Sequence, residues 1–128
     1  EGGGDVEETL VEFGLAAVAA LPAQGISYGD QRRLDLALAL TGRPRILLLD
    51  EPTAGLSFEE SMKLATSLRE MATRRGVTVL LVEHDMEVVF AIADRITVLQ
   101  LGRVLAEGPP AEVRANAEVV RAYLGSAA

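Results

Sequence analysis

The chain has 128 residues, of which 49% are hydrophobic, and this composition suits one modest domain and excludes a disordered tail. Its formal net charge of −7 argues against a nucleic-acid partner, because proteins that bind a polyphosphate backbone along its length are usually basic. The sequence contains no cysteine, which excludes disulfides and thiolate metal sites.

No uninterrupted hydrophobic run reaches the roughly 18 residues of a membrane span, and no signal peptide is visible. We therefore expect a cytoplasmic protein. The first residue is Glu rather than Met, which predicts that these residues are part of a longer chain.

The N-terminal residues 5–21 predict two short helices, because apolar residues recur at helical spacing and glycine and proline interrupt the pattern. Another helix is expected from Ser27 to about Leu40, since Ser27 with Asp30 three residues later is typical of a capping pair. The start of a helix offers unpaired N–H groups to an anion, but an ordinary capped surface helix explains the same residues.

Four other residues near this helix start can be interpreted from their chemistry. Gly29 would let the backbone approach a ligand closely. We interpret Tyr28 as a spacer at the helix start rather than as a residue that stacks on a ligand. Arg32 and Arg33 are expected to be solvated or to pair with acids on neighbouring elements.

A run of four large apolar residues, 46–49, leads directly into Asp50 and Glu51. A run this short and unbroken predicts a strand buried on both faces. Pro52 ends the strand and leaves both carboxylates at its carboxyl end, where open α/β sheets bind ligands. Two such acids suit a magnesium–phosphate site, one for the metal and one to accept a proton from water, although solvated acids at a strand end explain the same sequence.

The following residues repeat the alternation of helix and strand. A capping box at 57–60 opens a helix that Gly76 ends, and residues 78–82 form a second apolar strand that we expect to be buried. A helix over 86–93 and a third strand over 95–100 come next. This order predicts a parallel sheet with right-handed crossovers.

The C-terminal residues predict a small extension. The third strand should turn at Gly102 into residues 104–107 and form an antiparallel hairpin. Two prolines at 109 and 110 then begin a short helix, and residues 117–124 form a last one.

Four segments in this order and spacing resemble the nucleotide-binding subunit of an ABC transporter. Residues 26–31 resemble the signature motif, usually Leu-Ser-Gly-Gly-Gln, with Tyr28 in place of a glycine and Asp30 inserted before Gln31. Residues 48–52 resemble the Walker B strand with its catalytic acid. The segments 54–57 and 82–85 stand where that family has its D-loop and its switch histidine, and the resemblance extends over nearly the whole chain.

The closest resemblance is to the ATPases of branched-chain amino acid uptake systems. It is carried by Tyr-Gly-Asp-Gln in the signature, by Val-Glu-His-Asp-Met and by the ending Ala-Tyr-Leu-Gly. Lipopolysaccharide-export ATPases share the tyrosine and a similar ending, so they remain an alternative. A non-hydrolysing interaction module derived from such an ATPase is another, although such a module has no need for Glu51 or His84.

The resemblance implies ATP hydrolysis coupled to solute transport, with ATP and Mg²⁺ as cofactors. Asp50 would bind magnesium, as hard cations prefer oxygen ligands. Glu51 would orient or deprotonate the attacking water, and His84 would contact the γ-phosphate and help to position that water.

The resemblance also implies partners. Ser27, Gly29 and Gln31 would hold the nucleotide bound by a second ATPase subunit in a head-to-tail dimer. Permease subunits in the membrane would bind the ATPase, which would place it on the inner face of the cell membrane. At the end of the D-loop, Ser57 departs from the acid often found there, and we favour its role as a helix cap.

One expected motif is missing. A phosphate loop reads Gly-x-x-x-x-Gly-Lys-Ser/Thr, and the only lysine, Lys63, has no such glycine pair before it. The chain thus resembles the C-terminal half of the ATPase: an α/β fold with part of a P-loop NTPase (RecA-like) parallel sheet. Residues 1–42 would belong to the helical signature subdomain, and residues 43–128 to the nucleotide-binding core with a hairpin and helix extension. We expect no ATP hydrolysis by this chain alone, and bare apolar surface on its sheet.

Overall fold

The structure is a computed structural model that describes residues 3–125, with side chains from residue 6 onward. The chain divides into two compact units, which meet in the sequence between Glu83 and His84. Each unit is described by itself. The expected boundary after residue 42 stays a prediction about subdomains.

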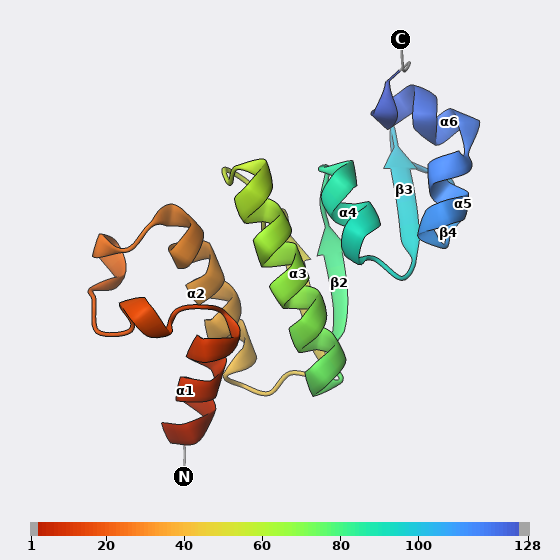
Figure 1. The fold of residues 1–128 in the computed structure, drawn as a ribbon. Coiled ribbons are helices and arrows are strands. Elements are labelled where there is room, and N and C mark those ends of the chain that lie inside the picture. Colours follow the sequence, from red (N-terminus) through yellow and green to blue (C-terminus); the bar gives the residue numbers. More distant parts are fainter. Residues whose placement is uncertain (1–2, 126–128) are drawn as a thin grey trace. The chain divides into compact units, whose positions relative to one another are not determined.

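The first unit contains three α-helices and two strands among its described residues (Figure 1). In chain order these are α1 (Gly3–Glu12), two short 3₁₀ turns (Ala16–Val18 and Ala23–Gly25), α2 (Tyr28–Leu40), β1 (Ile46–Asp50), α3 (Phe58–Arg75) and β2 (Thr78–Val82).

Local capping residues fix the starts of α2 and α3, as the sequence predicts. The Asp30 N–H donates to Ser27 Oγ at 3.1 Å ahead of α2. Ahead of α3, Ser57 and Glu60 form a complete capping box, in which each residue's side chain accepts from the other's backbone N–H. Gly76 ends α3 with a φ of 65°, in the left-handed region that glycine adopts without strain.

The sheet of the first unit is parallel, with β1 and β2 paired from Ile46↔Thr78 to Asp50↔Val82. The helix α3 connects them, as a parallel pair requires, and it buries a stripe of apolar residues. The buried members of this stripe are Leu64, Ala65, Leu68 and Met71.

Both strands are covered on one face only. Leu47 is 6% exposed, whereas its neighbour Leu48 is 69% exposed. Leu80 and Val82 on β2 are 61% and 56% exposed. The prediction of strands buried on both faces is therefore wrong for this chain, while the expectation of bare apolar surface on the sheet is confirmed.

A buried ion pair ties α1 to the end of α3. The Glu12 side chain is 6% exposed and accepts from Arg74 Nη1 at 2.6 Å and from Arg75 Nη2 at 2.7 Å. Arg75 Nη2 also donates to Thr9 Oγ1 at 2.8 Å. These contacts fix α1 within the first unit.

The second unit contains α4 (Met86–Ile92), β3 (Ile96–Gln100), β4 (Arg103–Gly108), α5 (Pro110–Ala115), α6 (Ala117–Val119) and a π-helical turn (Val120–Leu124). The two strands pair antiparallel, which confirms the predicted hairpin. The hydrophobic core of the second unit comprises Ile96, Val98, Val113 and Val119.

The predicted third parallel strand does not join the first sheet. Within the described residues, β3 pairs only with β4, and β1 only with β2. The strand itself lies at 96–100 as expected, but its partner is the hairpin strand that follows it. The expectation of one continuous parallel sheet is therefore corrected to two separate two-stranded sheets.

Candidate functional site

The turn after β1 begins with a strained residue. Glu51 has a φ of 46°, in the left-handed region that non-glycine residues rarely adopt. Its N–H donates to the Val82 carbonyl at 2.7 Å, so the turn starts from the end of both strands. The Ala54 N–H donates back to the Glu51 carbonyl at 3.1 Å and closes the turn.

The two predicted acids stand side by side at this position. Asp50 is the last residue of β1, Glu51 is the next, and both are exposed. No group of three or more potential metal-binding side chains exists within the described residues. Magnesium commonly takes only one or two carboxylates and completes its shell with water and phosphate oxygens, so the single carboxylate of Asp50 suits that ion.

Arg32 of α2 binds the backbone of the same turn. Its Nη2 donates to the Glu51 carbonyl at 2.9 Å, and its Nε donates to the Pro52 carbonyl at 3.2 Å. One planar guanidinium thus holds two adjacent carbonyls, which the fork geometry of arginine allows.

Tyr28, one helical turn before Arg32, holds the far end of the turn. Its hydroxyl donates to the Ala54 carbonyl at 3.2 Å. A Cβ atom added at Gly55 would lie 3.0 Å from Tyr28 Cε1, so the ring would have to shift slightly to admit a side chain there. The turn is therefore held by α2 at three carbonyl groups.

The fourth contact comes from the end of β2. Thr53 is 7% exposed, and its hydroxyl donates to Glu83 Oε2 at 2.6 Å. The Thr53 N–H lies 3.4 Å from the same oxygen. This carboxylate joins the ends of the two strands across the turn.

The predicted anion site lies at the start of α2. Ser27 caps this 13-residue helix and is exposed. Gly29 is buried, and a Cβ there would lie 3.4 Å from Glu60 Oε1. The Gln31 side chain donates to the Ala23 carbonyl at 3.0 Å, so in this structure its amide supports the preceding turn.

His84 is exposed and is the first residue of the second unit. The next residue, Asp85, caps α4 by accepting from the Glu87 and Val88 N–H groups at 3.1 and 3.5 Å. The structure thus brings Asp50, Glu51 and the start of α2 into one unit, and the role of His84 beside them stays a prediction.

Comparisons with known proteins identify the family. A model of the ABC transporter family matches residues 3–54, and one described as branched-chain amino acid ATP-binding cassette transporter matches residues 103–128. The branched-chain amino acid transport ATP-binding protein LivG of Salmonella typhimurium is 46% identical over 118 residues, which are 92% of this chain and 46% of LivG. The chain belongs to the family of ABC transporter ATP-binding proteins. Pseudomonas aeruginosa BraF, a protein of the same description, is 45% identical with the same coverage.

Solved ABC ATP-binding proteins share the fold. The cbiO1 subunit of the Clostridium perfringens cbiONQ transporter matches with a TM-score of 0.82 and 34% identity, covering 92% of this chain and 47% of cbiO1. The ADP conformation of MJ1267, an ATP-binding cassette, matches with a TM-score of 0.83 at 24% identity, covering 96% of this chain and 50% of MJ1267, and shows the fold alone. The chain spans about half the length of the curated relatives it matches. The α/β class, with part of a P-loop NTPase fold, is confirmed.

In this ABC ATP-binding chain, Arg32 and Tyr28 make contacts that differ from those expected from the sequence. Arg33 does pair with an acid, Asp30, at 2.5 Å. Arg32 instead binds backbone carbonyls, and Tyr28 contacts the D-loop segment rather than acting as a spacer. One signal was present, because residues four apart share a helix face, and Tyr28 and Arg32 are four apart.

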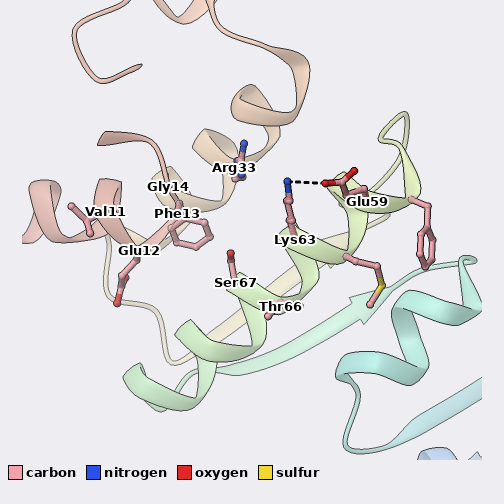
Figure 2. A pocket seen from close by; sticks show the side chains of 11 residues that line it. Val11, Glu12, Phe13, Gly14, Arg33, Glu59, Lys63, Thr66 and Ser67 are labelled. Atoms are coloured by element: carbon pink, nitrogen blue, oxygen red, sulfur yellow. Dashed lines mark ion pairs between the residues drawn. The ribbon is translucent and has the colours of Figure 1, made fainter. Parts of the chain in front are cut away.

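One hollow in the first unit lies away from the turn after β1. It is an open groove of about 620 Å³ beside α1 and α3 (Figure 2). Its lining residues are Val11, Glu12, Phe13, Gly14, Arg33, Phe58, Glu59, Met62, Lys63, Thr66 and Ser67. None of the six predicted site residues is among them, so the groove is not the candidate site.

No helix in the described part of the chain is long and apolar enough to cross a membrane.

Proposed function

We propose that this chain is the C-terminal half of an ATPase subunit that hydrolyses ATP to drive import of branched-chain amino acids. The observation that supports it best is the 46% identity to LivG over 92% of the chain. The match of the branched-chain family model to residues 103–128 favours this solute class over others. Relatives named for iron(III) import, such as FbpC of Streptomyces avermitilis, are 42% identical, which makes another ABC system the second candidate.

The chemistry we propose uses the two acids after β1. Asp50 would hold Mg²⁺ through a carboxylate oxygen, and the bound ion would supply positive charge beside the ATP phosphates. Glu51 accepts a proton from water as the water oxygen bonds to the γ-phosphorus and the bond from that phosphorus to ADP breaks. His84 contacts the γ-phosphate and helps to position the same water.

The second part of the proposal concerns partners. Ser27, Gly29 and Gln31 at the start of α2 bind the γ-phosphate of a nucleotide held by a second subunit, where helix N–H groups and the helix dipole favour an anion. Two subunits then complete two sites head to tail. Permease subunits hold the ATPase on the inner face of the membrane and carry the solute.

The proposal also assigns parts of the chain. Residues 1–42 contribute to the helical signature subdomain, and residues 43–128 to the nucleotide-binding core and its extension. The Gly-x-x-x-x-Gly-Lys-Ser/Thr cradle for the β- and γ-phosphates is missing from these 128 residues, so the chain alone hydrolyses no ATP.

Uptake into proteoliposomes tests the solute. The ATPase with its upstream half restored is assembled with its permease and binding protein, and ATP-dependent uptake of radiolabelled leucine is measured beside a Glu51→Gln control. Leucine accumulation that is lost in Glu51→Gln supports the proposal. ATP-driven movement of iron(III) or a lipopolysaccharide without leucine uptake would assign this ATPase subunit to another ABC transport system.

A further inference from the structure

The Glu51 backbone is held in a conformation that needs outside support. Its φ of 46° is unfavourable for a residue with a side chain, and it persists only where neighbouring groups fix it. The direction in which the carboxylate leaves the backbone depends on this angle. Whatever holds the peptide after Glu51 therefore helps to fix the direction in which its side chain starts.

Besides the backbone hydrogen bonds of the turn itself, two side chains from one face of α2 hold it. Arg32 donates to the Glu51 and Pro52 carbonyls at 2.9 and 3.2 Å, and Tyr28 donates to the Ala54 carbonyl at 3.2 Å. The guanidinium carbon of Arg32 lies 5.9 Å from the centroid of the Tyr28 ring, within reach of a cation–π contact. The two side chains thus support each other as well as the turn.

We propose that Arg32 and Tyr28 are positioning residues for the Glu51 carboxylate in ATP hydrolysis. They fix the backbone of residues 51–54 so that the carboxylate meets the attacking water, without touching ATP themselves. The inference rests on the proposed function, because it gives these two residues a task only if Glu51 accepts the proton. It also gives a second task to α2, whose first turn carries Ser27 and Gly29.

The test uses the ATPase with its upstream half restored and compares Arg32→Ala, Arg32→Lys and Tyr28→Phe. Asp35→Ala is the matched control, since Asp35 is an exposed charged residue on the same helix. We expect Arg32→Ala to lower kcat roughly 10- to 100-fold and to leave KM for ATP within about twofold, because a small misplacement of a catalytic group slows chemistry more than binding.

The milder variants give graded results. Arg32→Lys should stay closer to Arg32→Ala than to the unaltered protein, because an ammonium lacks the planar fork that reaches two carbonyls. Tyr28→Phe keeps the ring against Gly55 and loses only the hydroxyl, so kcat should fall by roughly threefold or more, with ATP affinity unchanged. If Arg32→Ala does not fold, Tyr28→Phe and Arg32→Lys decide the question.

Two outcomes would overturn the inference. One is a kcat within twofold of the unaltered protein in both Arg32 variants. The other is a fall in kcat that comes with a comparable fold-loss of ATP affinity and with a lowered melting temperature, which would mean a general structural role. Glu51→Gln, measured in parallel, distinguishes failure of the proposed function from failure of the positioning role. Hydrolysis retained in Glu51→Gln would contradict the proposed function. Hydrolysis lost in Glu51→Gln but normal in Arg32→Ala would contradict only the positioning role.

Discussion

Glu51 and Gly55 show how much the turn after β1 depends on single backbone angles. Glu51 at a φ of 46° is held by hydrogen bonds, while Gly55 at 79° adopts its conformation because it has no side chain. The ring of Tyr28 occupies the space where a Gly55 Cβ would stand. The positive φ of Gly55 and the nearby Tyr28 ring both disfavour a side chain at this position, and substitutions can separate the two effects.

Gly55→Ala should destabilise the chain more than Gly76→Ala. Both glycines have positive φ, 79° and 65°, but only the Gly55 Cβ would meet a neighbour within 4 Å. We expect Gly76→Ala to lower the free energy of unfolding by about 1 kcal/mol and Gly55→Ala by about 2 kcal/mol or more, since the second adds a clash to the strain. Chemical denaturation followed by circular dichroism measures both, and equal losses would show that the Tyr28 ring moves aside at no cost.

At the scale of elements, α1 is tied to the end of α3 by charge. The Glu12 carboxylate is 6% exposed and meets both Arg74 and Arg75. The pair of Lys63 with Glu59 on α3 is its exposed counterpart, with side chains 63% and 80% exposed and 3.1 Å between nitrogen and oxygen. Because one pair is buried and the other is exposed, we expect the two ion pairs to contribute very differently to the free energy of unfolding.

Glu12→Gln should cost about 1–3 kcal/mol of unfolding free energy, because it leaves Arg75, only 20% exposed, beside a neutral group. Glu59→Gln should cost less than about 0.5 kcal/mol, since exposed helix pairs contribute little. Urea denaturation of the two variants gives the comparison. A Glu12→Gln variant as stable as Glu59→Gln would mean that apolar packing alone holds α1.

Local signals explain which elements could be predicted from the sequence. The starts of α2 and α3 depend on residues three apart, Ser27 with Asp30 and Ser57 with Glu60, and both caps are present. Strand burial and strand partners depend on residues far away in the sequence or outside it. The exposed faces of β1 and β2 therefore contradict the prediction of strands buried on both faces, although bare sheet surface was itself expected, and the pairing of β3 with β4 alone contradicts the single parallel sheet.

The same reason explains what was missed at the candidate site. The acids after β1 can be found because an apolar run ends in Asp50 and Glu51. The acceptors of Arg32 are backbone carbonyls 19 and 20 residues away. Every residue has such a carbonyl, so the residue types in the sequence do not show which ones Arg32 binds. Only the fold brings the helix and the turn together.

At the scale of the whole molecule, the bare face of the parallel sheet is the main feature. Ile46, Leu48, Leu80 and Val82 are each more than half exposed, on alternate positions of paired strands. A contiguous apolar patch of this kind favours association. The 128-residue chain should therefore bind a hydrophobic dye and self-associate.

Leu48→Lys should reduce both the dye fluorescence and the associated fraction in analytical ultracentrifugation, because it places a charge in the middle of the patch. Leu101→Lys is the control, since Leu101 is 96% exposed at the hairpin turn of the second unit. A monomeric chain without dye binding, or an equal effect of the two substitutions, would contradict the role given to the sheet face.

The most direct test of the account is ATP hydrolysis by the protein with its upstream half restored, measured for the unaltered sequence and for Glu51→Gln. We predict steady turnover by the unaltered protein, none by the 128-residue chain alone, and a fall of roughly 100-fold or more in Glu51→Gln with ATP binding retained. Glu51→Gln turning over ATP at the normal rate, or no hydrolysis by either restored protein, would contradict the claim that this strand end carries the catalytic acid.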